Sequence, residues 1–250
     1  MNIDAPQIKD LPQLRRLWQE AFSDSEDFLD GFFATGFSHD RSLCLKIGDR
    51  PVAALYWFDC FLDGDKLAYL YAIATEKAYR GRGLCGQLMS ATHQKLKALG
   101  YAGSVLVPAG ERLFAFYGAM GYTGFCPMEE TTVTAGPVAA DLKKLTATDY
   151  FAIRRQYAPK ADIRQEQTAD YLATFTEFYG ADGAVMCMSR EGERLYFQEF
   201  LGDPHILPGV LTALGAKTGH LRLPGGNPYA MHLGFEKTLP EDAYLGIPLG

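Results

Sequence analysis

The segment EKAYRGRGLCGQLM, residues 76–89, limits what this chain can be more than any other part of the sequence. It joins an apolar run, which predicts a strand, to an amphipathic run, which predicts a helix. Gly81, Gly83 and Gly86 leave backbone N–H groups uncovered, because glycine has no Cβ to block close approach. The first N–H groups of a helix have no intrahelical partner, and the helix dipole favours negative charge there. The segment therefore predicts an anion site, with phosphate as the usual occupant.

Two arginines in this loop, Arg80 and Arg82, would add charge-assisted donors to such a site. The alternative is a turn that is basic without binding anything. A P-loop does not fit, because the sequence lacks the Gly-x-x-x-x-Gly-Lys-Ser/Thr pattern. The loop is interpreted as a diphosphate site of another type.

The charge and cysteine content narrow the class of protein. A formal net charge of −6 over 250 residues argues against a nucleic-acid binder, which would show a basic face. The chain has an odd number of cysteines, five, which are widely spaced and include no CxxC pair. This pattern predicts reduced thiols and not a set of disulfides or a zinc site. Residues 1–18 have no apolar signal segment, and no apolar run approaches the roughly 20 residues that cross a bilayer. We expect a cytoplasmic protein, a monomer or a homodimer, that binds neither nucleic acid nor membrane.

The apolar spacing and turn residues of the first half predict a mixed α/β sheet. The expected elements are helices over 10–22 and 24–37, three strands within 42–75, a helix from Leu84, a strand over 104–109, a helix over 111–122 and a strand over 125–135.

The composition changes at residues 134–144, which include Gly136 and Pro137, and this predicts a boundary between domains at 1–136 and 137–250. In the second domain we expect helices over 141–158, 167–180 and 204–216, the last with Pro208 inside it, and a hairpin over 184–202 that turns at Glu191 and Gly192.

The second half resembles a shortened copy of the first. Residues 104–122 and 219–235 both contain a strand, a proline, a glycine and then a tyrosine followed by Gly-aromatic, with three residues between Tyr and Gly in the first segment and four in the second. The alternative is that strand–turn–helix segments often look alike. The counterpart of the basic loop, residues 201–211, has no arginine and no glycine-rich turn, so we expect only the first copy to bind the anion.

The loop YRGRGLCGQLM resembles the Arg/Gln-x-x-Gly-x-Gly/Ala pyrophosphate loop of the GNAT superfamily of acyl-CoA-dependent N-acetyltransferases. Arg80 and Gly83 match, whereas Cys85 stands where the family usually has Gly or Ala. The resemblance covers about residues 1–135. It implies an α/β (α+β) GNAT fold with a mixed, splayed central sheet. The second half is similar to the degenerate GNAT-like lobe of two-lobed members.

This resemblance implies an N-acetyltransferase that moves an acetyl group from acetyl-CoA, as co-substrate, to a primary amine of a small-molecule or peptide acceptor by direct attack. Tyr117 stands where the family places the general acid, although it could be a core aromatic residue. The main chain of Ile73, Ala74 and Thr75 would bind the pantetheine arm. The pyrophosphate would lie on the backbone of Arg80, Gly81, Arg82, Gly83, Leu84, Cys85 and Gly86.

Two features depart from that family's pattern. Gly110 stands where members often carry an asparagine that contacts the pantetheine, and residues 67–75 contain no carboxylate that could be the base. The base could be Asp59, Glu129, Glu130 or the C-terminal carboxylate of Gly250, and an amine of near-neutral pKa could need none. A different class also stays open, namely an acyl-CoA-binding or regulatory module without turnover.

Other chemically capable side chains are expected to be structural. His93 lies in a predicted helix and is expected at its surface, and the remaining histidines lack metal-ligand spacing, so no metal is expected. Aromatic residues alternate along two predicted strands, so that alternate members should face the core and an acceptor pocket. These are Tyr56, Trp57, Phe58, Tyr69 and Tyr71.

Overall fold

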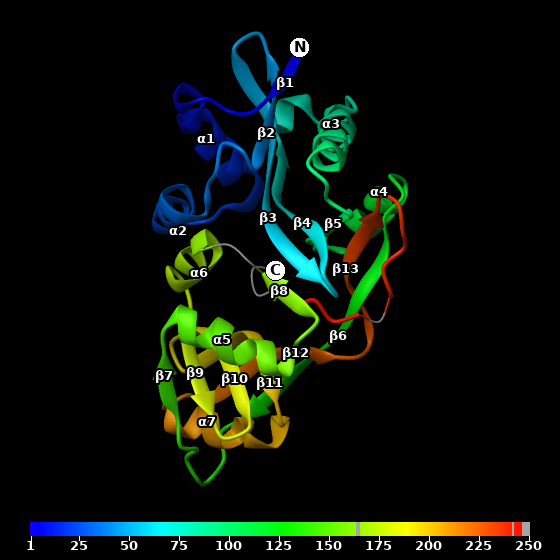
Figure 1. Ribbon diagram of the computed structural model, residues 1–250. Helices are drawn as coiled ribbons and strands as arrows, with labels where there is room; N and C mark the ends of the chain where they lie inside the picture. Colours follow the sequence, from blue (N-terminus) through cyan, green and yellow to red (C-terminus); the bar gives the residue numbers. More distant parts are fainter. Residues whose placement is uncertain (164–165, 242, 247–250) are drawn as a thin grey trace. The chain divides into compact units, whose positions relative to one another are not determined.

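The structure is a computed structural model that describes all residues except 164–165, 242 and 247–250 (Figure 1). The chain forms two compact units. Unit 1 contains residues 1–123, 163–168 and 231–239, and unit 2 contains residues 124–162, 169–230 and 240–250. The predicted domain boundary after residue 136 remains a prediction.

Unit 1 is built on a mixed sheet. Its strands β1 to β4 are antiparallel, β4 and β5 are parallel, and β5 pairs antiparallel with residues 231–234 of β13. The parallel ladder joins 67–69 to 103–105 and stops there, while β4 continues to Thr75. The strands are β1 (Asn2–Asp4), β2 (Ser42–Ile47), β3 (Arg50–Leu62), β4 (Asp65–Thr75), β5 (Gly103–Leu106) and β13 (Asn227–Gly234).

The helices of unit 1 cover both faces of this sheet. In Figure 1, α1 and α2 lie on one side of β2 to β4 and α3 lies on the other. Helix α1 buries Leu14, Leu17 and Trp18, which share one face at helical spacing. The helices are α1 (Leu11–Phe22), α2 (Glu26–Gly31) with a π-helical turn η2 (Phe32–Gly36), α3 (Leu84–Ala98), α4 (Glu111–Gly118), and the short turns η1 (Ile8–Asp10) and η3 (Lys77–Tyr79). The elements predicted for this half are confirmed.

Unit 2 contains a second mixed sheet. Residues 128–134 of β6 pair with β12, β12 is parallel to β11, and β10, β9 and β7 follow in antiparallel order. Helix α7 packs on one face of this sheet together with Phe197 and Leu221, and α5 packs against β9, β10 and β11. The elements are β6 (Thr123–Thr134), β7 (Lys143–Leu145), α5 (Ala147–Tyr157), β8 (Ala161–Ile163), α6 (Glu166–Ala173), β9 (Glu177–Ala181), β10 (Ala184–Glu191), β11 (Arg194–Gly202), η4 (Pro204–Ile206), α7 (Leu207–Ala213) and β12 (Thr218–Pro224).

Three sequence predictions for the second half need correction. The helix predicted over 141–158 is limited to α5, because residues 143–145 form strand β7. The helix predicted over 167–180 ends at Ala173, and strand β9 begins at Glu177. Pro208 lies in the first turn of α7 and not inside a longer helix, because a proline at that position lacks only an N–H that has no helical partner. The hairpin over 184–202 is confirmed by the pairing of Glu191 with Arg194.

The resemblance between the two halves holds for part of their topology. In both, an antiparallel hairpin is followed by a helix and then by a strand parallel to the second hairpin strand, namely β3–β4–α3–β5 and β10–β11–α7–β12. The likeness ends after β12, because residues 227–234 form strand β13 where the first half has the tyrosine-bearing helix α4. A turn at Gly225 and Gly226, both with positive φ, leads directly into this strand.

The last strands of the two halves are exchanged. Strand β6 follows the first half of the chain, yet its residues 128–134 pair with β12 in unit 2. Strand β13 follows the second half, yet its residues 231–234 pair with β5 in unit 1. Each sheet is therefore completed by the strand that follows the other half in sequence.

No helix in the described part of the chain combines the length and the apolar character that a membrane crossing requires.

Candidate active site

A cavity of about 440 Å³ in unit 1 brings most of the predicted site residues together. Its wall is formed by the end of β4, the glycine-rich loop, the first turn of α3 and helix α4. Among the residues predicted to bind the co-substrate or to donate the proton, Arg82 alone does not line it. The predicted residues in the wall are Ile73, Ala74, Thr75, Arg80, Gly81, Gly83, Leu84, Cys85, Gly86 and Tyr117.

The loop has the backbone geometry of an anion site. Gly81 and Gly83 have φ values of 74° and 73°, in the left-handed region that favours glycine. A Cβ at either position would meet no atom within 4 Å, so the backbone conformation, and not a lack of space, requires glycine. Gly83 is also the N-cap of α3 and supplies no capping side chain. The first N–H groups of this 15-residue helix therefore lack a capping partner.

The two arginines have different places in the loop. Arg80 Nε donates to the carbonyl oxygen of Thr75 at 2.9 Å, which ties the loop to the end of β4. Arg82 Nη2 donates to the carbonyl oxygen of Ala78 at 3.0 Å, and its guanidinium lies 5.1 Å from the centre of the Tyr79 ring. Arg80 can thus act directly on a bound anion, whereas Arg82 supports the loop from outside the cavity wall.

The end of β4 lines the cavity and pairs with β3 on one edge, while the β4–β5 ladder does not extend along its other edge. The β4–β5 ladder stops at Tyr69, so β5 does not pair with residues 73–75. The register of β3 and β4 shifts nearby, and Ala72 has a φ of 48°, which is unusual for a residue with a side chain. This bulge re-aims the last residues of β4, as bulges beside functional sites commonly do.

Tyr117 lies in the cavity wall with only 6% of its surface exposed. Burial, with a smaller contribution from Cys85, raises its pKa above the ordinary value of a phenol, so the hydroxyl keeps its proton. Burial also raises the pKa of the Cys85 thiol to about 11. The cavity therefore makes both thiols and phenols weaker acids than they are in water.

A hydrogen-bonded group lies behind Tyr117. The ring of Tyr122 packs edge-on against the ring of Tyr117 at 5.9 Å, and its hydroxyl lies 2.7 Å from Ser104 Oγ and 2.9 Å from His93 Nε2. The prediction that His93 lies at the surface is wrong. The His93 ring packs against Tyr122, which shields it from water. This burial, with a smaller contribution from the charge of Lys97, lowers the pKa of His93 to about 4.

The proposed bases are not in this cavity wall. Asp59 is buried in unit 1, where it accepts a hydrogen bond from Tyr101 and pairs with Arg41 and Lys66. Glu129 and Glu130 belong to unit 2. Gly250 lies outside the described residues. None of the five aromatic residues of β3 and β4 lines this cavity either; Tyr56 packs against Trp18 and other rings of the core.

Sequence reasoning missed part of the wall. Phe22 and Phe116 are both about 40% exposed, although they are large and apolar, and both line the cavity. The sequence gives no signal for Phe22, because it lies more than fifty residues before the loop and no local pattern links them. The other missed residues are Ala21, Tyr79, Ala109 and Leu113.

A family model described as an acetyltransferase (GNAT) domain matches residues 2–125. The chain belongs to the GNAT superfamily. Membership implies acyl transfer and confirms the predicted mixed, splayed sheet of this fold. No curated protein matches the chain.

Solved GNAT structures share the fold at low sequence identity. A GCN5-related N-acetyltransferase from Kribbella flavida has a TM-score of 0.70 and 17% identity, over 92% of this chain and 70% of its own. One from Anabaena variabilis ATCC 29413 has a TM-score of 0.68 and 14% identity, over 92% and 72%. A tandem GNAT protein from the clavulanic acid biosynthesis pathway has a TM-score of 0.59 and 12% identity, over 95% and 99%.

Among the described residues, no group of three or more His, Cys, Asp or Glu side chains is placed to hold a metal ion.

Proposed function

We propose that this protein transfers an acetyl group from acetyl-CoA to a primary amine of a small-molecule or peptide acceptor. One observation carries the proposal: a single cavity contains the bulged end of β4, the uncapped start of α3 and the buried hydroxyl-bearing Tyr117. The end of β4 suits an extended arm, the start of α3 suits a diphosphate, and the Tyr117 hydroxyl suits a leaving thiolate.

The backbone would hold the co-substrate. The pyrophosphate would accept hydrogen bonds from backbone N–H groups between Arg80 and Gly86, which include the uncapped start of α3. The Arg80 side chain would add a positive charge. The main chain of Ile73 to Thr75, which β5 leaves unpaired, would pair with the pantetheine arm as an added strand does. Gly110 cannot supply the amide side chain of the usual asparagine, so the arm would depend more on this main chain.

Tyr117 would donate the proton that the leaving group needs. The amine nitrogen attacks the thioester carbonyl carbon, the C–S bond breaks, and the thiolate sulfur takes the Tyr117 proton. The nitrogen releases one proton to water, and water returns a proton to the Tyr117 phenolate. A thiolate in water is a weaker base than a phenolate, since the pKa values are about 8.5 and 10. Burial raises the pKa of both the Cys85 thiol and the Tyr117 phenol, so Tyr117 keeps its proton until a thiolate forms beside it.

A direct test compares two tyrosines in the same wall. Tyr117→Phe should lower kcat by about 10²–10⁴, the usual contribution of a general acid, and leave CoA affinity unchanged. Tyr79→Phe is the matched control, because Tyr79 also lines the cavity, and should change kcat little. The assay is thiol release from acetyl-CoA with a panel of amines.

Two results would change the proposal. Full turnover by Tyr117→Phe would remove the general-acid role but not the acyl transfer. Tight CoA binding by the wild type without acetylation of any amine would favour the alternative, an acyl-CoA-binding or regulatory module.

A further inference from the structure

Two tyrosines, Tyr117 and Tyr122, begin and end the sequence YGAMGY and are tied to each other at the end of α4. The backbone N–H of Tyr122 donates to the carbonyl oxygen of Tyr117 at 3.2 Å. Gly121, with a φ of 93°, lets the chain turn back after the helix. The two rings also pack edge to face, with centroids 5.9 Å apart. The place of Tyr117 therefore depends on Tyr122 through both the main chain and the side chain.

The hydroxyl of Tyr122 joins this turn to two other elements of the candidate active site. It lies 2.7 Å from Ser104 Oγ in β5 and 2.9 Å from His93 Nε2 in α3. Ser104 and Tyr122 are only 0% and 3% exposed. Helix α3 begins at the glycine-rich loop, and β5 is the parallel partner of β4. One hydroxyl thus links the end of α4 to the helix and the sheet that form the rest of the cavity wall.

The histidine in this group is fixed by its surroundings. Its ring packs against the rings of Tyr122 and Phe235, with centroids 5.8 and 5.7 Å away. The pKa of His93 is lowered to about 4, so the ring is neutral near pH 7. Burial raises the pKa of Tyr122, so its hydroxyl keeps its proton. The contact between them is therefore uncharged and adds no charge near Tyr117.

We propose that Tyr122 is a positioning residue for acyl transfer: its hydroxyl, held by Ser104 and His93, fixes the turn after α4 and so the direction of the Tyr117 hydroxyl. Within the described part of the chain, the cavity wall includes Tyr117 but not Tyr122. Tyr122 therefore acts through Tyr117 and not on the substrate. A general acid must lie about 3 Å from the atom that it protonates, and a displacement of about 1 Å can lower the rate markedly. The inference rests on the proposed role of Tyr117.

The test is a double-mutant cycle on the full chain, measured as thiol release from acetyl-CoA with the most reactive amine of the panel. Tyr122→Phe keeps the ring and the backbone bond but removes the hydroxyl. It should lower kcat by about tenfold or more and change the KM for acetyl-CoA by less than about twofold. In the Tyr117→Phe background, Tyr122→Phe should change kcat by less than about twofold, because the acid that it positions is already gone. A residue needed only for folding would lower kcat in both backgrounds.

Tyr101→Phe is a control matched for burial. Tyr101 belongs to the same hydrophobic core as Tyr122, and its hydroxyl also makes two buried hydrogen bonds. It accepts from Trp57 Nε1 at 3.2 Å and donates to Asp59. This variant also loses a buried hydroxyl, yet kcat should stay within about twofold of the wild type, because Tyr101 does not act through Tyr117.

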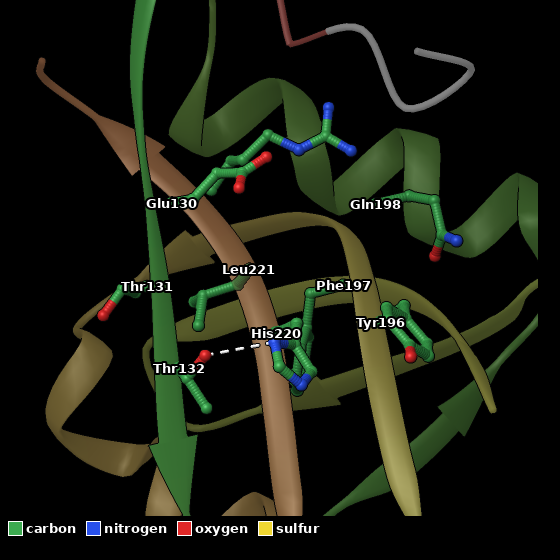
Figure 2. Close-up of a pocket in the computed structure, with 9 residues that line it drawn as sticks. Glu130, Thr131, Thr132, Tyr196, Phe197, Gln198, His220 and Leu221 are labelled. Carbon is green, nitrogen blue, oxygen red and sulfur yellow. Dashed lines mark hydrogen bonds between the residues drawn. The ribbon is translucent and has the colours of Figure 1, made fainter. Parts of the chain in front are cut away.

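Tyr196→Phe is a control for a tyrosine beside a histidine. In unit 2, the Tyr196 ring is stacked on His220 with centroids 5.4 Å apart, and His220 Nδ1 lies 3.0 Å from Thr132 Oγ1 (Figure 2). These residues line a cavity of about 380 Å³ that shares no residue with the candidate active site. This variant should leave both kcat and KM unchanged.

The outcomes separate the positioning role from the proposed function. Full kcat in Tyr122→Phe, an equal loss in Tyr101→Phe, or a further tenfold loss when Tyr122→Phe is added to Tyr117→Phe would overturn the positioning role alone. Full kcat in Tyr117→Phe, or no thiol release with any amine, would remove the general acid and with it the role of Tyr122.

Discussion

Replacing Arg154 with methionine tests whether a buried ion pair holds unit 2 together. The Arg154 and Glu199 side chains are both only 1% exposed. Arg154 Nε and Nη2 donate to the two Glu199 oxygens at 2.6 and 2.9 Å. The same guanidinium donates to the carbonyl oxygens of Ala161, Leu245 and Gly246, at 2.7, 3.0 and 3.2 Å. One side chain thus joins α5, β11, β8 and the last described residues of the chain.

The expected loss follows from what the substitution leaves behind. Methionine keeps the apolar stem but removes the charge and every donor. Burial alone would raise the pKa of Glu199, but the Arg154 charge and hydrogen bonds from Arg154, Tyr150 and Tyr244 lower it below its ordinary value. In the variant, a buried carboxylate keeps only the two tyrosine hydroxyls. Breaking a buried pair in this way costs about 3–5 kcal/mol of the free energy of unfolding.

The matched control is an exposed pair in the same unit. Lys217 Nζ lies 2.7 Å from Glu193 Oε2, but these side chains are 74% and 63% exposed. Lys217→Met should therefore cost less than about 1 kcal/mol. Urea unfolding followed by circular dichroism would show the difference as a shift of the midpoint by about 1–3 M for Arg154→Met. Equal, small losses for Arg154→Met and Lys217→Met would refute the reasoning.

Three further predictions concern unit 1. His93 has a pKa lowered to about 4 in the folded protein, against about 6.5 unfolded, so the unfolded chain binds the extra proton between these values. The wild type should lose about 2–3 kcal/mol of stability from this group as the pH falls from about 6.5 to 4. His93→Gln should lack that part of the loss in urea titrations at several pH values. A Cβ at Gly103 would lie 2.6 Å from the carbonyl oxygen of Leu233, so Gly103→Ala should lower the free energy of unfolding by about 1–3 kcal/mol. An unchanged melting temperature would contradict the β5–β13 pairing. Arg80→Ala should weaken CoA binding by about tenfold, and Arg82→Ala by less, because Arg82 lies outside the cavity wall; equal calorimetric affinities for wild type and Arg80→Ala would contradict a direct contact.

Local patterns were enough to predict most elements of unit 1, but not strands β1 and β13. The strand, the glycine-rich loop and the helix from Leu84 depend on residues next to one another, and their turn and capping signals are strong. The loop pattern alone was less specific, because residues 81–86 also read Gly-x-Gly-x-x-Gly, the spacing of a dinucleotide-binding turn. The sheet separates the two, since β4 is antiparallel to β3 and not part of a doubly wound parallel sheet.

Strand partners could not be predicted in the same way. Residues 231–234 carry no local signal that distinguishes β5 of unit 1 from β12 of unit 2, because strands pair through main-chain groups that every residue offers. Pairing is decided by the whole sheet and by distant residues. For the same reason, the sequence predicted the glycine-rich part of the cavity but not Phe22, which reaches it from the end of α1.

The exchange of β6 and β13 sets an order of events during protein synthesis. The sheet of unit 1 needs residues 231–234, which leave the ribosome about 110 residues after Thr123. At about 5–20 residues per second, this delay is roughly 5–20 s. Throughout that time the N–H and C=O groups at the free edge of β5 can pair with another nascent chain. A premature stop between residues 124 and 230 would therefore also leave unit 1 with an open, aggregation-prone edge.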